Sequence, residues 1–114
     1  MEGMTDDALV VRGGKNRIED IERGTAMHPS GVTGISVESA PRASIRELAA
    51  AIPHGQVGVT TVGEVRRLGG DVVRTAGRSP NHATLTGLSP EQVNRLLTPT
   101  VPNPALGDTS LGRD

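Results

Sequence analysis

The residues best suited to chemistry in this 114-residue chain are a histidine and two threonines at alternate positions. In His82-Ala83-Thr84-Leu85-Thr86, an extended backbone places His82, Thr84 and Thr86 on one face and the two apolar residues on the other. A neutral imidazole can take a proton from a ribose 2′-hydroxyl and return one to the leaving 5′-oxygen, while hydroxyl and guanidinium donors hold the phosphate. The pattern therefore predicts RNA cleavage without a metal, with His82 as general acid and base and Thr84 on the phosphate.

The place of an arginine in this site depends on strand register. If residues 71–75 and 82–86 pair as an antiparallel hairpin with Thr75 opposite His82, then Thr75 joins the face of His82 and Arg74 points away. A slip of one residue exchanges Arg74 for Thr75. Arg74 is therefore one of two candidate cations for the scissile phosphate.

Arg66 is the other candidate cation, and Thr61 and Thr86 are candidate substrate-binding hydroxyls. Thr61 follows an expected strand and opens an expected helix, where free amides favour an anion. A purely structural interpretation stands beside each of these. Thr61 can serve only as a helix cap, and His82 can be a strand-end histidine bonded to a loop carbonyl beside ordinary strand threonines.

The elements that must position these residues follow from apolar periodicity and capping boxes. The expected strands are residues 8–12, 31–38, 56–60, 71–75 and 82–87, and the expected helices, the first capped by Asn16, are 17–24, 45–52, 62–68 and 90–97. The fold class is α+β, with a small mixed sheet of about five short strands and about four short helices. Residues 1–97 form one domain, and 98–114 are a proline-containing extension with a frayed tail over 107–114.

Composition limits the chemistry that this domain can perform. The chain has no Phe, Tyr, Trp or Cys, which excludes aromatic base-stacking platforms, tyrosine chemistry, disulfides and thiolate catalysis. Its three histidines lie far apart in sequence without metal-ligand spacing, so we expect neither a metal nor another cofactor for RNA cleavage. Without a long apolar run or a signal-peptide h-region, the chain is expected to be soluble, cytoplasmic and independent of membranes.

Charge is distributed unevenly along the chain. Residues 1–40 carry four basic and seven acidic groups, a balance of −3, whereas residues 41–95 carry seven arginines and four acidic groups, a balance of +3. Lys15 is the only lysine. Because a guanidinium can bind phosphate through two parallel hydrogen bonds, the middle of the chain can meet a polyanion, although an arginine bias also arises from GC-rich coding.

The His82-Ala83-Thr84-Leu85 segment resembles the histidine-x-threonine-hydrophobe signature of the two-histidine phosphoesterases, which process RNA 2′,3′-cyclic phosphates. That family needs two copies, and neither His28-Pro29-Ser30-Gly31 nor His54-Gly55-Gln56-Val57 supplies the second. A small helix-plus-sheet domain with late Arg, His and Thr residues is also similar to the RelE/barnase-like ribonuclease toxins of bacteria. This resemblance implies a toxin acting on RNA and a cognate antitoxin or immunity protein as partner.

A second resemblance starts at the other end of the chain. Leu9-Val10-Val11-Arg12-Gly13-Gly14 looks like the first strand of ADP-ribosyltransferase domains, which ends in an arginine that holds the phosphate or ribose of NAD. Gly34-Ile35-Ser36-Val37 then stands for the later serine-bearing strand, so Arg12 and Ser36 become candidate substrate-binding residues. The catalytic glutamate of that family has no clear counterpart, since Glu91 lies in a helix first turn, and the aromatic ring that usually grips nicotinamide is missing.

A third interpretation is a non-enzymatic protein-binding module, in which Arg12 is a surface residue and Ser36 a plain strand serine.

Overall fold

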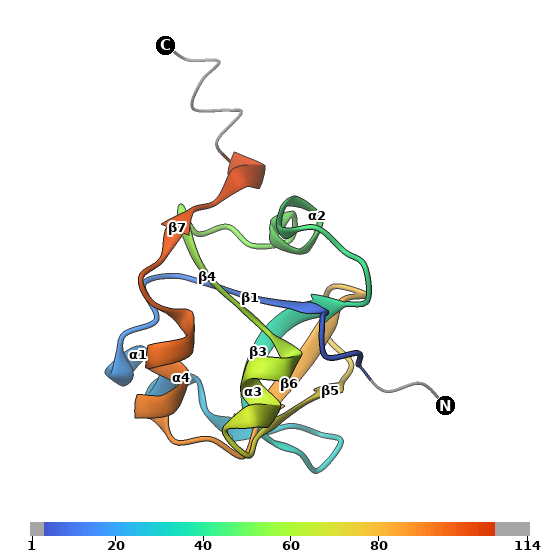
Figure 1. The fold of residues 1–114 in the computed structure, drawn as a ribbon, viewed down its shortest axis with the longest axis vertical. Coiled ribbons are helices and arrows are strands. Elements are labelled where there is room, and N and C mark those ends of the chain that lie inside the picture. The colour runs from blue at the N-terminus through green and yellow to red at the C-terminus, as the bar shows by residue number, and fades with distance from the viewer. Residues whose placement is uncertain (1–3, 107–114) are drawn as a thin grey trace.

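The computed structural model describes residues 4–106, which form an α+β fold (Figure 1). The strands are β1 (Leu9–Gly13), β2 (Ala26–Met27), β3 (Thr33–Ala40), β4 (Gln56–Thr61), β5 (Asp71–Arg74), β6 (His82–Thr86) and β7 (Val101–Pro102). The helices are α1 (Ile18–Gly24), α2 (Ile45–Ala49), α3 (Val62–Arg67) and α4 (Pro90–Leu97). All five expected strands and all four expected helices are present.

The seven strands form one sheet in the order β5-β6-β3-β1-β4-β7, with β2 beside β3. Every pair is antiparallel, so the expectation of a mixed sheet was wrong in that respect. The two unexpected strands, β2 and β7, have two residues each. Such a strand is too short to produce an alternating pattern in the sequence.

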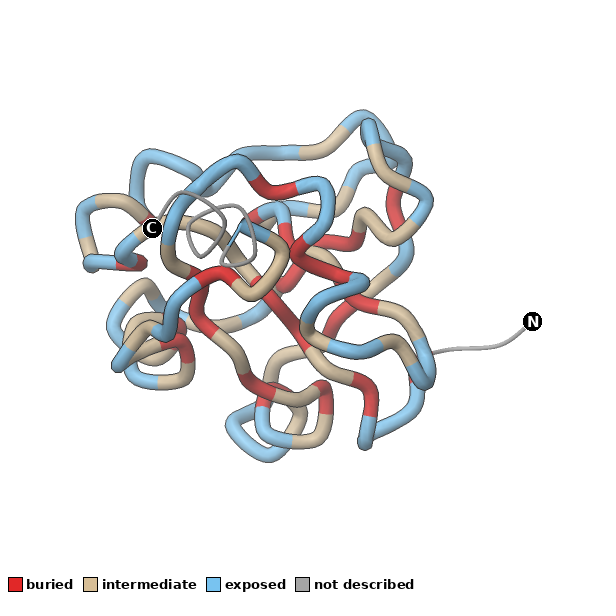
Figure 2. The backbone as a smooth tube through the Cα atoms, turned by 90° about the horizontal axis from the view of Figure 1, so that it is seen from above, coloured by how far each residue is buried: buried red, intermediate tan, exposed pale blue. Residues whose placement is uncertain are grey.

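Two hydrophobic clusters lie on the two faces of the sheet. Val10 and Leu85 belong to the larger cluster, to which α1, α3 and α4 contribute, and Val11 belongs to the smaller cluster, beneath α2. Neighbouring residues of β1 thus serve opposite faces, as strand alternation requires. Figure 2 shows the buried positions concentrated along the central strands, with exposed positions in the surrounding loops.

The sequence signals for helix starts are mostly confirmed. Ser44 and Ser89 form reciprocal capping boxes at α2 and α4, and the Thr61 hydroxyl accepts a hydrogen bond from the Glu64 amide at α3. Only α1 differs, because Arg17 rather than Asn16 occupies its N-cap.

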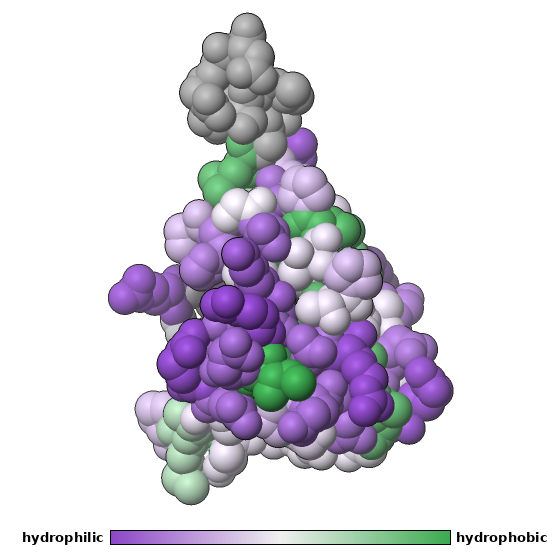
Figure 3. Space-filling view, turned by 90° about the vertical axis from the view of Figure 1, so that its left-hand side faces the viewer, coloured by the Kyte–Doolittle hydropathy of each residue, from purple (hydrophilic) through white to green (hydrophobic). Residues whose placement is uncertain are grey.

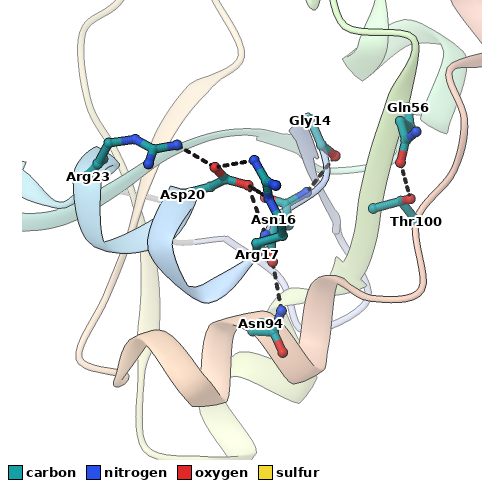
Figure 4. Close-up of polar contacts among 8 residues, drawn as sticks. All are labelled: Gly14, Asn16, Arg17, Asp20, Arg23, Gln56, Asn94 and Thr100. Atoms are coloured by element: carbon teal, nitrogen blue, oxygen red, sulfur yellow. Dashed lines mark hydrogen bonds and ion pairs between the residues drawn. The ribbon is translucent and has the colours of Figure 1, made fainter.

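Asn16 instead anchors the turn that follows β1. It is 1% exposed, has a positive φ of 55°, and its amide nitrogen donates to the carbonyls of Arg12 at 3.1 Å and Gly14 at 3.2 Å. The Asn94 side chain of α4 donates to the Asn16 carbonyl at 2.8 Å (Figure 4). These bonds fix the backbone at the end of β1.

The proline-containing segment after α4 continues along the sheet. Val101 pairs with Val57, and the Thr100 hydroxyl donates to the Gln56 side chain at 2.6 Å (Figure 4). Asn103 is 1% exposed and donates to the carbonyls of Ile52 and His54. The expected frayed tail, residues 107–114, lies outside the described residues.

The outer face that bears α1 and α4 is mostly hydrophilic, with a small hydrophobic area near its centre (Figure 3). Within residues 4–106, no helix has the length and apolar character needed to cross a membrane.

Candidate active site

The β5–β6 hairpin has the register that places Thr75 opposite His82. Asp71 pairs with Thr86 and Arg74 pairs with Ala83, and the Thr75 amide donates to the His82 carbonyl at 3.4 Å. The prediction that His82 and Thr75 share a face is therefore confirmed.

The side chains of His82, Thr75 and Thr84 form a short hydrogen-bonded row. His82 Nδ1 lies 3.0 Å from Thr75 Oγ1 and 3.2 Å from the Thr75 carbonyl oxygen, and Thr75 Oγ1 lies 2.9 Å from Thr84 Oγ1. Thr75 and Thr84 are buried, whereas His82 is only partly buried. The row orients the imidazole and leaves its other nitrogen, Nε2, free of hydrogen bonds to residues 4–106.

His28 lies beside this row, which its sequence position did not suggest. The ring centroids of His28 and His82 are 5.3 Å apart, with an angle of 38° between the rings. His28 reaches this place from the turn between β2 and β3, where its Nδ1 is buried without a hydrogen-bond partner. No sequence signal identifies this pair, because the turn that brings His28 to β6 follows a two-residue strand.

Arg74 points to the opposite face of the sheet, as the register requires. Its guanidinium donates to the backbone carbonyls of Ser39 at 2.8 Å and His82 at 2.9 Å. Arg74 therefore ties strand ends together and does not accompany the His82 imidazole.

The remaining candidates from the sequence also have local roles. Arg66 forms ion pairs with Asp6 at 2.6 Å and Asp71 at 2.9 Å, and these hydrogen bonds raise the pKa of Arg66. Thr61 caps α3, and Thr86 donates to the Thr33 carbonyl. Neither Arg66 nor Thr61 is hydrogen-bonded to the His82 row.

Arg12 and Ser36 meet where β1 and β3 separate. The pairing of β1 with β3 ends at Val11, whereas its pairing with β4 continues to Gly13. Beyond this point the Arg12 side chain still links the two strands, because its Nη1 donates to the Ser36 carbonyl at 2.8 Å. Arg12 Nε is buried without a partner, and burial lowers the pKa of Arg12 despite the opposing attraction of Asp20.

Arg12 and Ser36 line one cleft of about 220 Å³. Glu38, two residues after Ser36 on the same face of β3, also lines it, and Glu38 Oε1 is buried without a hydrogen-bond partner. His54 borders the cleft from the segment after α2, and its ring lies so close to Gly13 that a Cβ there would be 2.5 Å from His54 Cδ2. Glu38 was not among the candidates, although strand alternation from Ser36 was sufficient to find it.

The His82 row and the Arg12 cleft are adjacent on the sheet. In the β3–β6 register Ser36 pairs with Thr84 and Glu38 pairs with His82. Directly opposite residues of antiparallel strands project to the same face within side-chain reach. Ser36 and Glu38, which line the cleft, therefore lie on the same face of the sheet as Thr84 and His82. Arg12 alternates with Val11 along β1 and belongs to the other face, from which its side chain reaches the Ser36 carbonyl.

No protein-family model, curated protein or solved structure matches the chain. Among residues 4–106, no three His, Asp or Glu side chains gather as a metal site.

Proposed function

We propose that the chain is an ADP-ribosyltransferase-like domain that binds NAD in the cleft between β1 and β3. The observation that supports this most strongly is the state of Arg12. Within residues 4–106 no carboxylate lies within ion-pair distance of its guanidinium, and its buried Nε has no acceptor. Such a group is costly unless an anion binds it, and the NAD pyrophosphate supplies that anion.

Glu38 complements Arg12 in this proposal. Its unpartnered Oε1 can accept hydrogen bonds from ribose hydroxyls. A carboxylate beside the ribose also stabilises the positive charge that develops at C1′ as nicotinamide leaves. Glu38 thus takes the part of the catalytic glutamate that the resemblance implies, from a position on β3 rather than from Glu91.

The size of the cleft determines which half of NAD it takes. Its volume of about 220 Å³ is below the roughly 300–1,000 Å³ of sites that enclose a drug-sized ligand. We assign it the nicotinamide, the adjoining ribose and its phosphate, because this half contains the bond that breaks. The adenosine half then lies outside the cleft.

Substitution of Arg12 tests the proposal. Arg12→Ala should weaken NAD binding roughly 10- to 100-fold, because it removes charge-assisted hydrogen bonds to phosphate. Arg12→Lys should bind NAD with intermediate affinity, because it keeps the charge and loses the planar fork. The measurements are calorimetric NAD affinity and nicotinamide release, with Arg95→Ala, an exposed cation of α4, as matched control. Equal NAD affinity in Arg12→Ala and Arg95→Ala would contradict the proposal.

A second candidate function is RNA cleavage by His82 without a metal. The observation that favours it is the pair of imidazoles 5.3 Å apart, one of them oriented by Thr75. Two histidines can act as general base and general acid in one displacement. This candidate requires RNA to be cut in EDTA to 2′,3′-cyclic ends, with loss of cleavage in His82→Ala and not in Arg12→Ala. Intact RNA after prolonged incubation excludes it.

Either chemistry suits a toxin-like bacterial effector that a cognate antitoxin or immunity protein holds in check. A binding module without catalysis consumes no NAD, cuts no RNA and tolerates His82→Ala.

A further inference from the structure

We infer that His82 is a general base which activates a hydroxyl group as the acceptor of ADP-ribose. The inference rests on the proposed function and assigns the acceptor side of the same site. It also gives a role to the His82 row, which binding of NAD by Arg12 and Glu38 leaves unused.

The hydrogen bonds of His82 determine which ring nitrogen can act as a base. The Thr75 carbonyl oxygen, 3.2 Å from Nδ1, can only accept, so Nδ1 carries the hydrogen in this contact. In the neutral imidazole the lone pair then resides on Nε2. Thr75 Oγ1 and, beyond it, Thr84 Oγ1 continue the row behind Nδ1 and hold the ring in this orientation.

One strand, β3, lies between His82 and the NAD cleft. Glu38 lines the cleft and is the cross-strand partner of His82 in the β3–β6 register. A ribose held against Glu38 of β3 therefore lies next to His82 of β6, on the same face of the sheet. An acceptor that approaches C1′ from the β6 side passes the free Nε2.

The reaction then balances without any further reactant. The bond between ribose C1′ and the nicotinamide nitrogen breaks, and its electron pair neutralises the pyridinium ring. A bond forms between C1′ and the acceptor oxygen, and the acceptor proton passes to His82 Nε2 and from there to water. The products are an O-linked ADP-ribose, nicotinamide and one proton.

This role of His82 defines the acceptor class. A hydroxyl is a weak nucleophile until its proton is removed, whereas a carboxylate or another anion needs no base. We therefore assign a hydroxyl as acceptor, as found on serine, threonine, ribose or water. The distinction between hydroxyl and anionic acceptors also provides the test.

The experiment compares methanol and azide as acceptors with the full chain and NAD, separating methyl and azido ADP-ribose by chromatography. In His82→Ala, transfer to methanol should fall about 10²- to 10⁴-fold, the usual contribution of a general base. Transfer to azide, which has no proton to lose, should stay within about threefold. Added imidazole should restore transfer to methanol in this variant.

The outcomes separate this inference from the proposed function. If His82→Ala loses both transfers equally and imidazole restores neither, His82 is structural and the inference is overturned, while NAD binding by Arg12 stands. If wild-type protein neither binds nor consumes NAD, the proposed function fails and the inference fails with it. If His82→Ala does not fold, the same two transfers are measured in Thr75→Val, which keeps the carbonyl contact with Nδ1 and removes the Thr75 hydroxyl. In that variant, a loss of transfer to methanol with transfer to azide retained supports the inference. An equal change in both transfers overturns it.

Discussion

Among the carboxylates of residues 4–106, Asp20 has the most strongly shifted pKa. Arg17 donates its Nε to the Asp20 side chain at 3.0 Å and its backbone amide at 3.1 Å, and Arg23 approaches the other carboxylate oxygen (Figure 4). The hydrogen bond from Arg17, joined by the charges of both arginines, lowers the pKa of Asp20 from 3.8 to about 2. These contacts close the first turn of α1.

The lowered pKa of Asp20 predicts a dependence of stability on pH. A carboxylate with a lower pKa in the folded state stabilises the fold above its unfolded pKa, and this stabilisation is lost as the pH falls from about 4 through the folded pKa of about 2. Asp20→Asn should therefore melt below the wild type at pH 7, and the difference should shrink towards pH 2 and vanish below it. Asp7→Asn, at an exposed carboxylate, is the matched control. A difference between wild type and Asp20→Asn that is constant from pH 7 to pH 2 would contradict this account.

The candidate site shows which residues a sequence can reveal. Alternation along 71–75 and 82–86 limited the neighbour of His82 to Thr75 or Arg74, because the face of a residue depends on the register of two adjacent strands. The sequence left that register open, and the structure has the one that brings Thr75 to His82. The same alternation was sufficient to identify Glu38 from Ser36. The sequence could not identify His28, because its place beside His82 depends on the path of a turn that no local pattern encodes.

The contact between the strands β3 and β6 depends on Gly34. A Cβ at this position would lie 2.1 Å from the Leu85 carbonyl oxygen and 2.9 Å from Thr84 Cγ2. Both atoms belong to β6, so a side chain at Gly34 would force apart the strands that carry Ser36 and Thr84. Glycine is needed here for close approach of the backbones.

Gly34→Ala is accordingly expected to destabilise the protein by about 1–3 kcal/mol, the usual cost of overpacking, because a backbone carbonyl cannot move aside easily. Gly55→Ala is the control, since nothing lies within 4 Å of a Cβ there, and it should change the free energy of unfolding by less than about 0.5 kcal/mol. Urea denaturation measures both. Equal midpoints and slopes for the two variants would show that the β3–β6 contact adapts to a methyl group.

Element boundaries were predictable where a local signal exists. Ser44 and Ser89 mark helix starts because their side chains bond the first free amides. Asn16 is also a favoured N-cap residue, but it does not cap α1, because hydrogen bonds with Arg12 and Asn94 hold it in the interior. Short strands such as β7 arise from pairing with β4, which the sequence of residues 101–102 alone does not encode.

The absence of Phe, Tyr and Trp means that aliphatic side chains fill the interior on both faces of the sheet. Leu85 belongs to the larger cluster and is 2% exposed, and Leu48 of α2 belongs to the smaller cluster and is fully buried. The leucines of the sequence are therefore not equivalent. Leu68, by contrast, is 36% exposed at the C-terminal end of α3.

Leucine truncations should reveal this difference directly. Leu85→Ala is expected to lower the free energy of unfolding by about 2–5 kcal/mol, because it removes buried methyl groups and leaves a cavity that no aromatic ring can fill. Leu68→Ala removes the same atoms from a partly solvated site and should lower it by less than about 1 kcal/mol. Since a domain of this size has a total stability of roughly 5–15 kcal/mol, only the first variant should melt near physiological temperature. Urea denaturation of both variants beside the wild type decides the matter, and equal losses would mean that Leu68 is buried in solution.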